Sequence, residues 1–500
     1  MANTKLGPLP PLREQLLRRK PIVFQHQHHV GEELARNMTT FQLTMFGVGA
    51  TVGTGIFFVL GEAVPKAGPA VLVSFLIAGL AAGLSALCYA ELASAIPVSG
   101  STYSYAYHAL GEIVAVVIAG CVLLEYGVAT GAVAVGWSGY FNELIDSLFG
   151  FRLPQALSVS PIPGIDGEPT GGLINLPAVV LVLLCMLLLL RGASESARVN
   201  AIMVMIKLGV LLLFVVIGLT AFQADHFANF FAAGFAGVSA AAGTIFFSFI
   251  GLDAVATAGE EVKNPQKALP RAIIGALLIV TTVYVLVAFA GIAAKPTSFF
   301  STPEAAEAGL AQILKDVTGS TLWSTILAAG AVVSIFSVTL VTLYGQTRIL
   351  FAIGRDGLIP HRFTEVNPKT MTPTFNTIVV AIAVALIGGF VPSDYLWDTV
   401  SIGTLMAFSV VAIGIMVLRR THPGLERPFK IPGYPVTPIL TVVVCLYIMW
   451  GLAAVTWIIF LTWIAIVVIF YFAFGRRHAR LNSYTSLEEI AEPKGTVDAE

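Results

Sequence analysis

Runs of apolar residues that are long enough to cross a lipid bilayer follow one another along almost the whole chain. About 20 apolar residues cross the hydrocarbon core, which is roughly 30 Å thick, as one α-helix. Of the 500 residues, 56% are apolar and 11% are charged, whereas about 25% are charged in an average soluble domain. The pattern therefore predicts one all-α membrane domain rather than several soluble domains.

Twelve spans are predicted from these runs. They lie at 40–62, 70–90, 113–142, 176–190, 199–222, 236–258, 272–294, 320–344, 375–391, 396–418, 436–457 and 459–475. An even number of spans places both termini on one side of the membrane. Residues 1–39 and 476–500 are then predicted to be tails on that side.

The Lys and Arg residues indicate which side this is. With the N-terminus inside, 23 of the 28 Lys and Arg residues lie in inner segments, four lie in outer loops, and Lys207 lies within a span. Such an excess is typical of cytoplasmic segments. We therefore expect a multi-pass protein of the cell membrane with both tails in the cytoplasm. The basic runs at 260–271 and 348–369 follow from this orientation and need no nucleic-acid partner.

Neither an enzyme nor a metal site is predicted. All four cysteines lie within apolar runs, and no HExxH motif or Cys/His cluster lies in or beside the spans. A nutrient sensor would usually carry a large soluble domain, for which the two tails are too short. We expect no metal and no organic cofactor.

Span 1 contains the sequence GVGATVGTGIF at residues 47–57. Each glycine weakens a helix by about 1 kcal/mol relative to alanine. Gly49 and Gly53 form a small-xxx-small pair, which also serves close helix packing, so the segment is either a packing face or a break in the helix. A break would expose N–H groups that suit an anion and carbonyls that suit an ammonium group. At membrane depth such backbone is tolerated only where it lines a polar cavity.

Span 6 contains a second candidate interruption, FFSFIGLD at residues 246–253. If spans 1–5 (residues 40–222) and 6–10 (residues 236–418) are corresponding halves, the odd number of spans inverts the second half. Paired interruptions in inverted halves point to a transporter site. Residues 436–475, spans 11 and 12, lie outside the repeat.

The chain resembles the amino acid–polyamine–organocation superfamily, and most closely the bacterial relatives of the cationic amino acid transporters. The stretches that carry the resemblance lie at 47–57, 89–107, 124–140, 246–273, 344–360 and 427–435. The resemblance implies a leucine-transporter-like fold with a five-plus-five inverted repeat, broken helices 1 and 6, and helices 11 and 12 added. Animal members of the cationic branch usually have fourteen spans, so their substrate preference does not transfer directly.

The resemblance also implies a substrate site at the two breaks. The α-carboxylate would meet N–H groups and the α-ammonium would meet carbonyls, while the ring of Phe247 would cover the substrate and the small Thr342 would admit large side chains. The residues implied as substrate-binding are Thr51, Gly53, Thr54, Gly55, Phe247, Ser248, Ile250 and Thr342. Gly53, Thr54 and Gly55 would supply the N–H groups, and Phe247, Ser248 and Ile250 the carbonyls.

Three ionisable residues well inside the predicted spans are candidates for proton coupling. Lys207 follows Arg198 by nine residues, about 14 Å along a helix, which places it near mid-membrane, where such residues are usually functional. It either carries a proton or takes the place of a sodium ion, or it tethers span 1 carbonyls. Glu125 and Asp253 either relay protons, recognise a cationic side chain, or pin the broken helices.

Glu91, His108 and Glu112 lie near inner span ends and are expected to be solvated. The predicted function is a proton-coupled symporter of L-amino acids that works by alternating access, with a broad or cationic substrate range. The alternative is a uniporter or exchanger of cationic amino acids in which Lys207 is a fixed charge. The expected partners are the substrate and the lipid bilayer.

Overall fold

Only helices are found in the described part of the chain. The computed structural model describes residues 11–21, 37–98, 100–163, 170–392, 396–450 and 454–483. Within these ranges the one backbone pairing of strand type is an isolated bridge between Met38 and Val262. The all-α prediction is confirmed for these residues. Much of the predicted tails, including residues 1–10, 22–36 and 484–500, lies outside the described residues.

Eight helical segments of the described residues are long and apolar enough to cross a membrane, and three further apolar helices are shorter. Every predicted span contains one helix, except the first and sixth, which each contain two. Twelve crossings stay a prediction. The helices within the predicted spans are α2 (Thr40–Thr51), α3 (Thr54–Ala67), α4 (Val71–Ala95), α6 (Glu112–Phe149), α8 (Leu176–Arg191), α9 (Ala193–Thr220), α10 (Gly234–Phe246), α11 (Ala254–Thr257), α12 (Pro265–Ala294), α14 (Thr321–Arg355), α15 (Thr374–Phe390), α16 (Trp397–Thr421), α17 (Val436–Trp450) and α18 (Ala454–Phe470).

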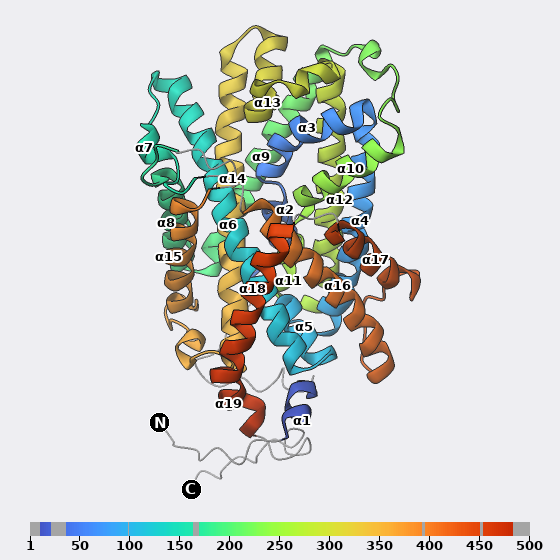
Figure 1. Ribbon diagram of the computed structural model, residues 1–500, viewed down its shortest axis with the longest axis vertical. Helices are drawn as coiled ribbons and strands as arrows, with labels where there is room; N and C mark the ends of the chain where they lie inside the picture. Colours follow the sequence, from blue (N-terminus) through green and yellow to red (C-terminus); the bar gives the residue numbers. More distant parts are fainter. Residues whose placement is uncertain are drawn as a thin grey trace.

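Five further helices lie outside the predicted spans. They are α1 (Leu12–Leu17), α5 (Ser101–Ala109), α7 (Gln155–Ser158), α13 (Pro303–Thr318) and α19 (Arg476–His478). Helices α1 and α19 lie at one end of the molecule, and α13 lies at the opposite end (Figure 1). We call these the tail end and the far end. The long helices α6 and α14 run between them.

The centre of the molecule is a tightly packed set of helices around α6 and α14. Trp137 of α6 donates its indole N–H to the carbonyl of Val332 on α14 at 3.0 Å. A Cβ added at Gly131 would lie 2.6 Å from a methyl group of Ile387 on α15, so glycine is needed for this close approach. The breaks in the first and sixth spans lie against this packed centre.

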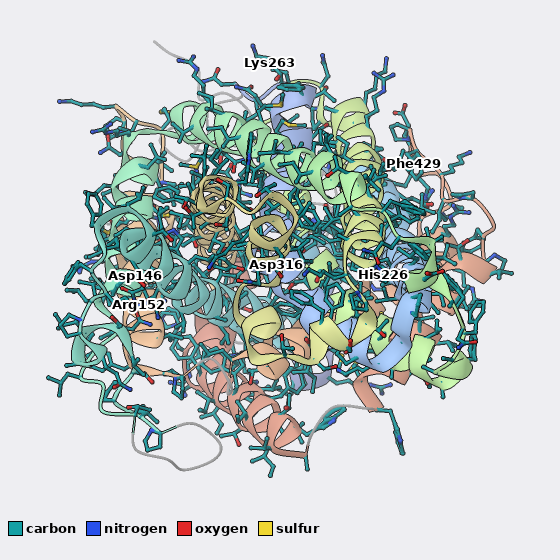
Figure 2. The ribbon with its side chains drawn as sticks, turned by 90° about the horizontal axis from the view of Figure 1, so that it is seen from above. Asp146, Arg152, His226, Lys263, Asp316 and Phe429 are labelled. Carbon is teal, nitrogen blue, oxygen red and sulfur yellow. The ribbon has the colours of Figure 1, made fainter. Side chains whose placement is uncertain are left out.

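At the far end, α13 is attached to the end of α12. Lys295, the residue that follows α12, forms an ion pair with Asp316 of α13 at 2.7 Å. Asp316 lies near the centre of the molecule when it is viewed from above, whereas the Asp146–Arg152 pair at the end of α6 lies at the periphery (Figure 2). Helix α13 therefore covers part of the far end.

The expectation that Glu91, His108 and Glu112 are solvated was wrong. Their exposed fractions are 1%, 1% and 0%, because each accepts or donates within a polar cluster at the tail end. Arg419 donates two hydrogen bonds to the Glu91 carboxylate, at 2.9 and 2.6 Å. These polar side chains near the span ends therefore bond to protein groups from distant parts of the sequence.

Residues of the N-terminal segment close the tail end. Arg18 pairs with Glu112 at 2.5 Å, and Lys20 pairs with Asp356, the residue after α14, at 2.5 Å. Glu112 also accepts the hydroxyl of Tyr471 at 2.6 Å. These contacts join the residues after α1 to α6, to the end of α14 and to the end of α18.

The imidazole of His108 is part of this closure. Its Nδ1 lies 2.7 Å from the carbonyl oxygen of Lys20, so the neutral ring donates its proton there. Burial, and next the neighbouring Lys20 ammonium, lower the pKa of His108 to about 4. The ring is therefore neutral in the folded protein at physiological pH.

Acid is expected to weaken this closure through His108. An unfolded histidine has a pKa of about 6.5, so between pH 6.5 and 4 the unfolded state binds the extra proton and stability falls as the pH falls. At pH 5 the loss is about 2 kcal/mol, from 1.5 units at 1.36 kcal/mol each. The measurement is the melting temperature in detergent at pH 7.5 and pH 5, for wild type and His108→Asn. The wild type should lose more on acidification than the variant, and an equal loss in both would contradict the assignment.

Candidate functional site

The first predicted span is interrupted at its middle. Helix α2 ends at Thr51, and α3 begins at Thr54 after Val52, which is extended, and Gly53. No side chain caps the first turn of α3, so the N–H groups there are not satisfied by a capping residue. A Cβ added at Gly53 would lie 2.6 Å from a methyl group of Val338. Gly53 thus lies at the break and also allows close packing against α14.

The sixth predicted span is interrupted as well. Helix α10 ends at Phe246, a 3-10 turn η4 (Phe247–Phe249) follows, and α11 begins at Ala254. Ile250 is extended, and Gly251 has φ of +107°. Side chains rarely adopt such a φ, which explains the glycine at this point.

The two interruptions face each other, and Tyr284 of α12 joins them. Its hydroxyl lies 2.9 Å from the carbonyl oxygens of both Thr51 and Ser248 and shares its single proton between them. A Cβ added at Gly251 would lie 2.7 Å from the carbonyl oxygen of Ala50. Sequence reasoning missed Tyr284, because a single tyrosine in an apolar run carries no signal of what its hydroxyl bonds.

Lys207 of α9 lies behind the first interruption and is fully buried. Its ammonium donates to the carbonyls of Gly49 and Val52, at 3.0 and 2.5 Å, and to the Ser337 hydroxyl at 3.4 Å. Ser334 also donates to the Val52 carbonyl, at 3.1 Å. An ammonium group has three donors, and each has one acceptor here. The carbonyls that the break leaves without helical partners are therefore hydrogen-bonded by the Lys207 side chain.

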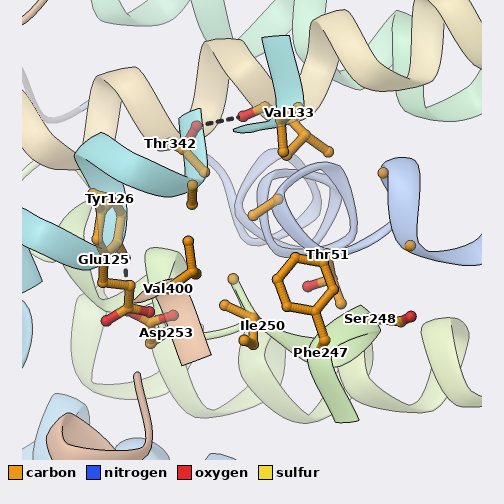
Figure 3. Close-up of a pocket in the computed structure, with 16 residues that line it drawn as sticks. Thr51, Glu125, Tyr126, Val133, Phe247, Ser248, Ile250, Asp253, Thr342 and Val400 are labelled. Atoms are coloured by element: carbon orange, nitrogen blue, oxygen red, sulfur yellow. Dashed lines mark hydrogen bonds between the residues drawn. The ribbon is translucent and has the colours of Figure 1, made fainter. Parts of the chain in front are cut away.

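A pocket lies between the two interruptions (Figure 3). Its lining combines backbone of both breaks with side chains of α6, α14 and α16. The residues are Ala50, Thr51, Gly53, Gly55, Glu125, Tyr126, Ala129, Val133, Phe247, Ser248, Ile250, Gly251, Asp253, Val338, Thr342 and Val400. The pocket thus has the helix-start N–H groups, the carbonyls of the second break and two carboxylates within one site.

The structure brings most of the predicted site residues together here. Seven of the eight predicted substrate-binding residues line the pocket, together with Glu125 and Asp253. Thr54 begins α3, but its side chain is not among those described. Lys207 is not among the lining residues; it contacts the opposite side of the first break.

Glu125 and Asp253 lie side by side at one end of the pocket (Figure 3). Tyr126 donates its hydroxyl to Oδ2 of Asp253 at 2.7 Å. Among the described residues, Oδ1 of Asp253 and Oε2 of Glu125 are buried oxygens without a hydrogen-bond donor. Two such acceptors in one pocket can receive a proton or a cationic group.

Thr342 of α14 lines the same pocket through its small side chain. Its hydroxyl lies 2.8 Å from that of Thr130 on α6, which donates to it, and its own proton goes to the carbonyl of Val338 at 3.0 Å. The hydroxyl is therefore already satisfied by protein groups, so Thr342 limits the size of the pocket more than it adds polarity.

A family model described as "Amino acid permease" matches residues 38–474 of this chain. The chain belongs to the amino acid permease family, within the amino acid–polyamine–organocation superfamily. The permease is thus a multi-pass membrane transporter and not an enzyme. The motifs quoted from the sequence and this match cover the same part of the chain.

Three relatives of the permease are named as transporters of different substrates. It is 40% identical to the methylthioribose transporter of Bacillus subtilis (strain 168), over 93% of this chain and 99% of the relative. It is 42% identical to the branched-chain amino acid permease BcaP of the same organism, over 90% and 95%. It is 36% identical to the vacuolar cationic amino acid transporter 2 of Arabidopsis thaliana, over 83% of this chain and 64% of the relative.

Proposed function

We propose that the permease is a proton-coupled symporter of L-amino acids that works by alternating access. The observation that carries this proposal is the placement of Lys207, whose ammonium holds two carbonyls of the first break from behind the pocket. A neutral amine has two N–H donors where the ammonium has three, so loss of the proton removes one of the three contacts. The protonation state of Lys207 and the shape of the break are thereby linked.

The substrate backbone is proposed to bind at the two breaks. The carboxylate lies at the N–H groups of Gly53, Thr54 and Gly55, where the start of α3 has no side-chain cap and the helix dipole favours an anion. The ammonium lies at the carbonyls of Phe247, Ser248 and Ile250. Each carbonyl oxygen has two lone pairs, so the Ser248 carbonyl can accept from the substrate while it accepts from Tyr284.

The substrate side chain is proposed to extend toward Glu125 and Asp253. Their free oxygens suit a cationic or hydrogen-bonding side chain, and the apolar lining formed by Ala129, Val133 and Val400 suits an aliphatic one. We therefore propose a broad range that includes cationic amino acids. Phe247 covers the substrate from one side.

Alternating access is proposed to use the inverted repeat of residues 40–222 and 236–418. The tail end is then the cytoplasmic end, and the ion pairs of Arg18 and Lys20 hold it closed. Residues 436–475 form helices 11 and 12 outside the repeat, and the permease resides in the cell membrane.

Uptake into proteoliposomes tests the proposal. The purified permease is reconstituted and supplied with a panel of labelled amino acids, with and without an inward proton gradient. Accumulation above equilibrium only with the gradient supports symport. Equilibration without accumulation, or flux only when substrate is present inside, supports the second candidate. This is a uniporter or exchanger in which Lys207 is a fixed charge. The three acceptors around the Lys207 ammonium also fit a fixed charge.

The size of residue 342 is expected to set the largest side chain that the permease accepts. Thr342→Leu adds volume at the pocket lining and should reduce uptake of arginine, lysine and leucine about tenfold or more while uptake of alanine changes little. A tenfold change is about 1.4 kcal/mol, within the cost of inserting methylenes into a packed site. Thr342→Val removes the hydroxyl without filling the pocket and is the control. Equal loss for small and large substrates would contradict the assignment.

A further inference from the structure

A row of buried polar side chains leads from Lys207 toward the tail end. Asn200 lies seven residues before Lys207 on α9, about 10 Å along the helix and on the same face. Asn200 and Ser337 are 1% and 0% exposed. Neither was singled out from the sequence, and neither lines the pocket.

The direction of each hydrogen bond in this row is fixed by its neighbours. Asn200 donates from Nδ2 to the carbonyl of Met45 at 3.3 Å, so its Oδ1 must face Ser337. The Ser337 hydroxyl donates its only proton to that Oδ1 at 2.7 Å. Its lone pairs therefore face Lys207, which donates to it. Asn200 thus determines that Ser337 is an acceptor for the ammonium.

Asn200 also packs directly on the backbone that Lys207 holds. A Cβ added at Gly49 would lie 2.7 Å from both Nδ2 and Oδ1 of Asn200. Gly49 therefore serves two purposes: its carbonyl accepts from Lys207, and its missing side chain admits Asn200. The amide, the break and the ammonium form one packed unit.

No described charged group faces the ammonium from the elements packed against α9, which are α2, α8, α12, α13 and α14. Helix α2 has no ionisable residue, and Tyr284 of α12 is a neutral phenol that donates to Thr51 and Ser248. The remaining charged groups that the structure describes on these elements lie toward the two ends or are paired; they are Arg191, Arg198, Lys267, Arg271, Lys315, Asp316, Arg348 and Arg355. The Cys185 thiol of α8 lies against the Phe336 carbonyl, and Arg348 covers the ring of Tyr344. The surroundings of Lys207 are therefore set by neutral dipoles.

We propose that Asn200 is a positioning residue of the coupling machinery: through Ser337 it holds a lone pair against Lys207 and so favours the charged ammonium. This inference rests on the proposed coupling through Lys207. Without Asn200, the Ser337 hydroxyl loses the acceptor that fixes its orientation and polarises its oxygen, so the hydrogen bond that it accepts from the ammonium weakens. Lys207 then binds its proton more weakly.

The variant Asn200→Ala is expected to move the pH of half-maximal uptake toward acid by about one unit. Hydrogen bonds to charged groups contribute enough for a tenfold change in proton affinity. Because Lys207 must be protonated to couple, uptake should fall off at a lower pH, while uptake at acid pH stays within a few-fold of wild type. The measurement is uptake against external pH in proteoliposomes.

The matched control is Asn376→Ala. Asn376 is a fully buried asparagine of α15 that donates to the carbonyls of Thr347 and Phe363, at 3.2 and 2.9 Å, away from Lys207. Its removal is expected to lower stability and leave the pH profile unchanged. Asn200→Asp should restore the profile, since a protonated carboxyl can donate to the Met45 carbonyl and accept from Ser337.

A second variant guards against loss of folding. Ser337→Ala removes the bridging hydroxyl and should give the same acid shift as Asn200→Ala, with no further shift in the double variant. The inference would be overturned if Asn200→Ala and Ser337→Ala both gave the same pH profile of uptake as wild type and Asn376→Ala. If wild type itself shows no proton-driven accumulation, the proposed function fails, and the inference falls with it for that separate reason.

Discussion

Replacing Lys207 by alanine is expected to abolish proton-driven accumulation, with a loss of at least about a hundredfold. The ammonium satisfies the carbonyls of Gly49 and Val52, and leaving a buried acceptor without a donor costs about 1–3 kcal/mol each. The substitution leaves the Gly49 carbonyl without a donor and the Val52 carbonyl with Ser334 alone. It therefore changes the shape of the first break and also removes the proton carrier. Substrate binding, measured by thermal shift in detergent, should weaken but remain detectable.

The variant Lys207→Arg distinguishes the role of a positive charge at this position from the role of an exchangeable proton. Arginine keeps a cation at the break, but its guanidinium does not lose a proton in proteins. Under the proton-coupled proposal this variant folds, binds substrate and exchanges it, yet shows no accumulation driven by a pH gradient. Under the fixed-charge alternative it transports like wild type. Gradient-driven accumulation by either variant at the wild-type level would rule out Lys207 as the coupling residue.

Replacing Gly251 by valine is expected to remove folded, active permease. Gly251 has φ of +107°, and a β-branched residue in such a conformation costs about 1–3 kcal/mol. The added Cβ would also lie 2.7 Å from the carbonyl oxygen of Ala50, so the two broken segments could no longer pack together. We expect a loss of several kcal/mol, seen as a lower melting temperature and as uptake at background.

Gly243→Ala is the matched control for this effect. Gly243 lies in α10 of the same predicted span, and a Cβ added there meets nothing within 4 Å. Alanine is favoured over glycine inside a helix by about 1 kcal/mol, so the control should melt at or slightly above the wild-type temperature. If Gly251→Val melted like Gly243→Ala, the close contact between the two breaks would not exist.

The sequence predicted the interruption of span 1 but left its purpose open. Four glycines favour both packing and a break. In the structure Gly49 packs against Asn200, and Gly53 both lies at the break and packs against Val338. The interruption of span 6 had a weaker local signal, and its prediction depended on the place of the span in the repeat. Backbone geometry at Gly251 now gives it a local reason.

Predictions for charged residues failed where the environment of the residue depends on partners that are distant in the sequence. The position of Lys207 in the sequence alone placed it within a span. It was singled out as functional because the cost of burying a charge makes such residues rare. Glu91, His108 and Glu112 were expected to be solvated, since span ends usually face water. Their partners include Arg419, Lys20 and Tyr471, which lie far away in the sequence and carry no signal of that proximity.

The amino-acid sequence by itself determined the helical membrane class, the weak point at Gly53 and the presence of a lysine within a span. These properties depend on the hydrophobicity and backbone freedom of neighbouring residues, which are local. Only the tertiary structure decided that Lys207 and the pocket lie on opposite sides of one break, and that Tyr284 joins the two breaks. Hydrogen bonds between helices are set by the relative rotation and depth of those helices, and these arise only when all of them pack together.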